Sequence, residues 1–183
     1  MAGVWNKRIR GDARLVLLLQ RVDVGIKLKP IPESEAMQII ALPKEASPRL
    51  VWSEDENHHG SRLIEFGVRT PGHRGLLIEL MARQHKYVAG RVTLELGLLR
   101  RDFAFQHFER VYQLAIDGAA FVTHRESGQE PTYGAHELFG DRTNARPELN
   151  DLGFSDALGV FLSTINLILD DEPIPDPFEF RLK

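Results

Sequence analysis

The spacing of apolar residues changes along the chain, from every second residue to every third or fourth. The clearest alternation covers residues 91–99, where Val92, Leu94, Leu96 and Leu98 share one face and Thr93 and Glu95 point to the other. Successive side chains of a strand point to opposite faces, so this pattern predicts a half-buried strand. The two-residue period dominates up to about residue 120 and favours an antiparallel meander.

Further strands follow from short apolar runs between turn residues. Prolines 30 and 32 precede residues 37–42, which we interpret as a strand. The other predicted strands are 50–52 with its hairpin partner 62–68, then 76–81, 103–105, 112–116 and 134–139, the last beside 112–116. Together they predict an antiparallel sheet over residues 37–140.

The two ends of the chain are less regular. Residues 1–30 form a basic and apolar segment. Its pattern is compatible with two short strands at 13–20 and 22–29, although the first could equally start as a helix. Residues 173–183 contain three prolines, which suits an edge strand or a strap over the domain.

The last third of the chain predicts a helix over residues 151–169. Its apolar residues recur at spacings of three and four, which places them on one stripe, and Asp151 or Ser155 can cap its start. That stripe needs an apolar partner, and the meander offers one. The stripe comprises Phe154, Leu158, Phe161, Leu162, Ile165 and Ile168. The predicted fold is therefore a two-layer, single α+β domain spanning residues 1–183.

Composition limits the chemistry. Hydrophobic residues make up 43% of the chain, which is normal for a globular protein. The absence of cysteine excludes disulfides and thiolate chemistry, so a metal would need histidines and carboxylates. His58 and His59 have Asp55 and Glu56 nearby, but the side chains of adjacent residues diverge, so the pair is a poor metal chelate. We interpret these residues as a solvated loop. We predict no metal and no cofactor, and we expect His85 and His107 to be surface or half-buried histidines.

Two features bear on location. No run approaches the eighteen apolar residues of a membrane helix, and the first residues lack the apolar core of a signal peptide. We therefore expect no membrane partner and a cytoplasmic protein.

The net charge of −3 argues against a generally basic nucleic-acid-binding protein, yet arginines gather locally. Guanidinium groups bind phosphate or carboxylate in a two-pronged way. The alternative is that these arginines belong to solvated faces. The clusters are Arg8, Arg10 and Arg14, then Arg100 and Arg101, then Arg142 and Arg146.

The candidate chemistry lies between Asp117 and Arg142. Asp117 ends a predicted strand, His124 follows in the next loop, and His136 lies on the predicted strand 134–139. Two histidines can act as general acid and base in phosphodiester cleavage, without a metal. Arginines would stabilise the charge on phosphate. The predicted substrate-binding residues are Arg125, Arg142, Arg100 and Arg101. The alternative is a solvated hairpin loop whose histidines have no catalytic role.

The order of these segments resembles bacterial proteins related to TumE-type toxins of toxin–antitoxin systems. The resemblance covers about residues 75–170 and depends on the runs 75–80, 92–96, 112–118, His124-Arg125 and 134–139 before a terminal helix. It implies a toxin–antitoxin or defence locus, RNA as the target, and Asp117, His124 and His136 as the catalytic site. The family's histidine repeat is reduced here to single histidines separated by a long loop.

Two hypotheses follow. The first is a metal-independent, ribonuclease-like toxin that acts on RNA through His124 and His136. The second is a non-enzymatic binding protein or inhibitor from a mobile or defence-related locus, which meets an antitoxin or a target complex through a strand edge or the 173–183 tail. The net negative charge suits a protein that competes with nucleic acid or meets a basic partner.

Overall fold

An antiparallel sheet forms the centre of the computed structural model, which describes residues 28–46, 51–54, 60–105, 107–124, 130–169 and 173–179. Short β1 (Lys29–Pro30) joins it by parallel pairing with β7. The remaining strands, in sheet order, are β11 (Arg142–Ala145), β10 (His136–Phe139), β7 (His107–Ile116), β6 (Val92–Asp102), β5 (Leu76–Gln84), β4 (Ser61–Gly67) and β3 (Ser53–Glu54).

The register confirms the predicted alternation. Leu80, Leu96 and Leu114 lie opposite one another on β5, β6 and β7, and each is completely buried. The alternate positions Met81, Glu95 and Ala115 form the next row on the other face. One face of the sheet is therefore apolar and the other carries polar groups, as a two-layer fold requires.

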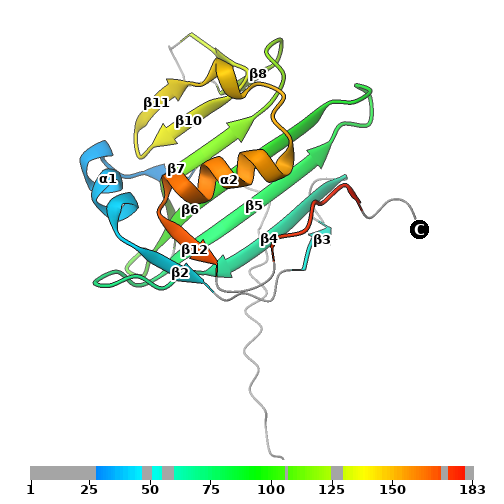
Figure 1. Ribbon diagram of the computed structural model, residues 1–183. Coiled ribbons are helices and arrows are strands. Elements are labelled where there is room, and N and C mark those ends of the chain that lie inside the picture. Colours follow the sequence, from blue (N-terminus) through cyan, green and yellow to red (C-terminus); the bar gives the residue numbers. More distant parts are fainter. Residues whose placement is uncertain are drawn as a thin grey trace, which may run out of the picture.

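Helix α2 (Phe154–Thr164) lies across the apolar face (Figure 1). Its Phe161 is completely buried and stacks on Tyr112 of β7, with ring centroids 5.8 Å apart. The helix packed on the meander confirms the predicted α+β domain for the described residues.

The bounds predicted for this helix were wrong at both ends. Gly153 is the N-cap, and neither Asp151 nor Ser155 caps the helix with its side chain. Asn166 has a left-handed φ of 52°, which ends the helical path. The last residues of the predicted helix instead form β12 (Leu167–Leu169), which pairs in parallel with β2 (Lys44–Ala46).

The predicted strand at residues 37–42 was also wrong, because the segment belongs to α1 (Glu33–Ala41). Ala36, Ile39 and Ile40 are buried at helical spacing. Glu33 and Glu35 lie in the first turn, where acidic groups favour the helix dipole, and Asp141 Oδ1 accepts the Glu33 N–H at 2.9 Å. The helix was not predicted because prolines flank the segment and because an apolar run of six residues is compatible with either a strand or a helix.

Two smaller corrections concern hairpins. Residues 103–105 lie in the turn between β6 and β7 rather than in a strand, with Phe103 57% and Phe105 76% exposed. The strand placed at residues 50–52 is β3 at Ser53–Glu54, and its predicted pairing with the next strand, β4, is confirmed. The segment 13–20 lies outside the described residues, and 22–29 does so except for its last two residues.

The described part of the C-terminal tail, residues 173–179, is a strap rather than an edge strand. Trp52 Nε1 donates to the Pro175 carbonyl at 2.8 Å, and Arg62 donates to the Pro177 carbonyl. Ile174 is buried. Among the described residues, no helix has the length and apolar character needed to cross a membrane.

Candidate functional site

A pocket of about 240 Å³ lies on the face of the sheet opposite α2, at the end where β7 finishes. We call it the Asp117 pocket. Strands β4 to β7 form its floor and β8 (Val122–His124) forms part of its wall. The lining residues are Ser61, Met81, Arg83, His85, Arg91, Thr93, Glu95, Ala115, Asp117, Val122 and Thr123.

Asp117 follows β7 directly and is only 2% exposed. Arg91 donates two hydrogen bonds to its carboxylate, from Nε to Oδ1 at 3.0 Å and from Nη2 to Oδ2 at 2.5 Å. The backbone N–H of Gly118 also donates to Oδ1, at 2.8 Å. A buried carboxylate needs such partners, because an unpaired charge away from water is costly.

Arg91 is held on a second side by an aromatic ring. Its guanidinium carbon lies 3.6 Å from the ring centroid of Phe121, which is a close cation–π contact. The hydrogen bond to Asp117 raises the pKa of Arg91 above its usual value. Arg91 is therefore a fixed positive charge in the wall of the pocket.

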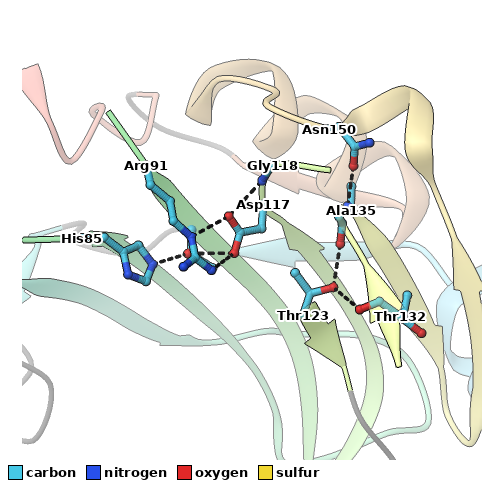
Figure 2. Close-up of polar contacts among 10 residues, drawn as sticks. His85, Arg91, Asp117, Gly118, Thr123, Thr132, Ala135 and Asn150 are labelled. Carbon is cyan, nitrogen blue, oxygen red and sulfur yellow. Dashed lines mark hydrogen bonds and ion pairs between the residues drawn. The ribbon is translucent and has the colours of Figure 1, made fainter. Parts of the chain in front are cut away.

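His85 is linked to the same carboxylate through Thr93. His85 Nε2 lies 2.7 Å from Thr93 Oγ1, and the Thr93 hydroxyl donates to Asp117 Oδ2 at 3.4 Å. Figure 2 shows His85, Arg91 and Asp117 pointing toward one another. Burial lowers the pKa of His85, and the charges of Arg91 and Arg83 lower it further, against the opposing effect of Asp117. The imidazole is therefore neutral near pH 7 and can accept a proton.

Two further groups leave hydrogen-bonding capacity inside the pocket. Arg83 is exposed and makes no ion pair with another described residue. Ser61 lies opposite Arg83 in the β4–β5 ladder, is 1% exposed, and its buried Oγ has no hydrogen-bond partner among the described residues. A cation and a hydroxyl at neighbouring positions are suited to bind an anionic oxygen.

The wall of the pocket is fixed by the pairing of β8 with β9 (Thr132–Tyr133). Thr123 Oγ1 donates to the Gly134 carbonyl at 2.6 Å, and Ala135 N–H donates to Asn150 Oδ1 at 2.6 Å (Figure 2). Gly134 has a φ of 68°, and a Cβ there would lie 2.3 Å from Asn150 Oδ1. Only glycine fits this close approach.

The structure brings some of the sequence-predicted catalytic residues to this pocket. Asp117 lines it, and the backbone of His124 follows Thr123 in β8. His136 lies opposite Ala115 in the predicted pairing of β10 with β7, but it is 1% exposed and does not line the pocket. Arg125 lies outside the described residues.

The other predicted arginines are not brought together. Arg142 is paired with Glu33 at 2.7 Å on the far edge of the sheet. Arg100 bridges Glu35 and Glu109, and Arg101 lies over the ring of Phe103, both toward the opposite end of β6. Their positions give no support to a shared phosphate site with Asp117.

Sequence reasoning missed Arg83, His85 and Arg91 as members of the site. The signal that could have found them is the register of strands β5, β6 and β7. Arg83 lies opposite Thr93, and Glu95 lies opposite Ala115, which is two residues before Asp117. Counting from the β5–β6 turn would have placed these side chains on one face.

A scan against protein-family models finds no match, and neither curated proteins nor solved structures show a significant similarity to this chain. The chemistry of the Asp117 pocket therefore has to be inferred from its own residues.

Proposed function

We propose that the protein acts on RNA at the Asp117 pocket, as a metal-independent ribonuclease-like toxin of a toxin–antitoxin or defence locus. One observation supports this proposal above the others. A histidine with a lowered pKa, an arginine that has no ion pair with the described residues, and a buried Asp–Arg pair line a single pocket. Neutral imidazole and guanidinium are the groups that metal-free phosphodiester cleavage needs.

The proposed reaction is transfer within the RNA backbone. His85 takes the proton from a ribose 2′-hydroxyl, whose oxygen attacks the adjacent phosphorus and expels the 5′-oxygen of the next nucleotide. The products are a 2′,3′-cyclic phosphate and a 5′-hydroxyl. Arg83 stabilises the charge on the phosphate oxygens, and Asp117 orients His85 through Thr93. We assign the proton donated to the leaving oxygen to His124.

The test is incubation of the full chain with total bacterial RNA in EDTA and, separately, in magnesium. We expect cleavage in both, and a loss of about 100-fold for His85→Gln, in line with removal of a general base. His124→Ala should lose activity similarly. His136→Ala, although His136 was a predicted catalytic residue, should retain the activity per folded molecule, because His136 is buried and does not line the pocket. His73→Gln is the matched control, because His73 lies in the 71–75 turn away from the pocket and should cleave like wild type.

The pH profile of cleavage gives a second readout. A general base works only when it is deprotonated, and the pKa of His85 lies below its usual 6.5. The rate should therefore rise with pH through the acidic range as His85 loses its proton, and fall again at higher pH as the general acid His124 loses its own. Equal cleavage by wild type and His85→Gln, both folded, would refute the assignment of His85.

The second candidate is a non-enzymatic binding protein. Phe103 and Phe105 are exposed at the β6–β7 turn, at the opposite end of β6 from the Asp117 pocket, and aromatic side chains are frequent anchors of interfaces. The strap 173–179 is already engaged with Trp52 and Arg62, which makes it the less accessible surface. Intact RNA in every lane, with folded protein, would favour this candidate.

A further inference from the structure

Three metal-ligand side chains converge at the base of the β6–β7 turn. Asp102 and His107 are the last pair of this hairpin, and Glu109 lies two residues further along β7 on the same face. One ligand atom from each of the three lies within 4.8 Å of the other two. We call this group the hairpin cluster.

The carboxylates of the hairpin cluster are each held by one oxygen. Asp102 Oδ1 accepts the backbone N–H groups of Ala104 and Phe105 at 2.8 and 3.2 Å. Glu109 Oε2 accepts two hydrogen bonds from Arg100, at 2.9 and 2.6 Å. The second oxygen of each acid accepts no hydrogen bond from a described residue. Outer partners that fix one oxygen and leave the other available are typical of metal-ligating carboxylates.

His107 supplies the observation that points to a ligand. Its Nε2 is buried, has no hydrogen-bond partner among the described residues, and lies 4.0 Å from Asp102 Oδ2. A buried polar atom without a partner is unfavourable, and here it faces an anionic oxygen. A cation between these atoms would satisfy the nitrogen and both acids together.

The charge around the hairpin cluster also suits a cation. Asp102, Glu109 and Glu35 contribute three negative charges, while Arg100 and nearby Lys29 contribute two positive charges. Arg100 is shared between Glu35 and Glu109, so it neutralises neither completely. One negative charge is left over before any ion binds.

We propose that Asp102, His107 and Glu109 form a divalent-cation site of the zinc class. One imidazole nitrogen and two carboxylate oxygens match the ligands of Zn²⁺, with bonds of about 2.0–2.2 Å. Tetrahedral bonds of this length place the ligand atoms about 3.3–3.6 Å apart, so a pair that is now up to 4.8 Å apart contracts by up to about 1.5 Å on binding. Three protein ligands leave a position for water. The ion braces the turn that carries Phe103 and Phe105, and it is separate from the Asp117 pocket.

The test uses the full chain, stripped with EDTA and desalted, then titrated with Zn²⁺ by calorimetry and with Co²⁺ by visible absorption. We expect one site per chain in wild type, and a Kd at least 30-fold higher for His107→Gln and for Asp102→Asn. Saturating Zn²⁺ should raise the Tm of wild type and leave that of His107→Gln unchanged. Equal Tm values in EDTA would show that His107→Gln is folded.

The matched control is the double substitution His58→Gln and His59→Gln, which removes two adjacent histidines that have acidic neighbours in the sequence and lie outside the described residues. It should bind Zn²⁺ like wild type. Loss of binding in this control but not in His107→Gln would overturn the proposal, as would the absence of binding by wild type at 1 mM Zn²⁺, a concentration about 1,000-fold above a micromolar Kd. RNA cleavage in EDTA should be the same for wild type and His107→Gln, so the two proposals can fail independently.

Discussion

Lys44 and Asp117 are both charged and both almost completely buried, at 1% and 2% exposure, but they lie on opposite sides of the sheet. Lys44 belongs to the helical layer, where its ammonium donates to the carbonyls of Ile40, Leu42 and Ile165 at 2.9, 2.7 and 2.8 Å. Asp117 lies on the far face, bonded to Arg91 and Thr93, and lines a pocket.

The difference is in the kind of partner. Lys44 satisfies backbone carbonyls at the C-terminal ends of α1 and α2, which have no other helical partner, and a cation there also favours both helix dipoles. The side-chain partners of Asp117 are Arg91 and Thr93, which are half-buried and line the pocket beside it. The buried charge on the helix-covered face therefore stabilises helix ends, whereas the buried charge on the far face lies in the wall of a pocket with polar side chains.

The largest effect on stability is expected for Phe161→Ala, on the helix-covered face. Phe161 is completely buried against Tyr112, so truncation should lower the free energy of unfolding by about 4 kcal/mol. Urea unfolding followed by circular dichroism measures this change. Cleavage per folded molecule should stay at the wild-type level, because Phe161 is remote from the Asp117 pocket.

The matched control for Phe161 is Ile168→Ala. Both residues belong to the apolar stripe predicted from the sequence, but Ile168 lies in β12 and is 64% exposed. Its truncation should change the free energy of unfolding by less than about 0.5 kcal/mol. Equal losses for the two variants would contradict the difference in burial between Phe161 and Ile168.

The next largest effect is expected for Lys44→Met. Three carbonyls lose a charged donor, which should lower the free energy of unfolding by about 3 kcal/mol. The exposed Lys29→Met is the control and should have an effect below about 0.5 kcal/mol. A loss as small as that of the control would show that water or backbone shifts replace the ammonium.

The pH dependence of the same pair of proteins is a sharper test. Burial lowers the pKa of Lys44 from 10.5 to about 8, so the unfolded chain holds this proton more tightly than the folded one. Wild type should therefore gain stability relative to Lys44→Met as pH rises from about 8 to 10.5, with a constant difference below pH 8. A difference that stays flat across this window would contradict the lowered pKa.

Much of the fold could be predicted because the long strands show a clear two-residue alternation of apolar residues and follow one another in the sequence. Residues 92–98 alternate cleanly, and their neighbours pair in sequence order, so the sheet follows from local patterns. The helix α1 and the end of α2 could not be predicted in this way. Both depend on tertiary contacts, such as Asp141 at the start of α1 and the pairing of β12 with β2.

The candidate site was predicted only in part for a related reason. Asp117 was identified because it follows a strand, a property of the local sequence. Arg91, His85 and Arg83 join it through strand register, which a single sequence specifies weakly without the turn geometry. Arg100, Arg101 and Arg142 look equivalent to them in sequence, but each already has an acidic or aromatic partner elsewhere.

The smallest stability effect that still separates the two faces is expected for Asp117→Asn. It breaks the two-pronged contact with Arg91, which should lower the free energy of unfolding by about 2 kcal/mol. The cleavage rate per folded molecule should also fall, because in the proposed mechanism Asp117 orients His85 through Thr93. The double variant with Arg91→Gln completes a thermodynamic cycle, and its loss should be smaller than the sum of the single losses because the two side chains share one interaction. Additive losses in unfolding, together with unchanged cleavage, would instead place Asp117 with Lys44 as a residue that serves only the stability of the fold.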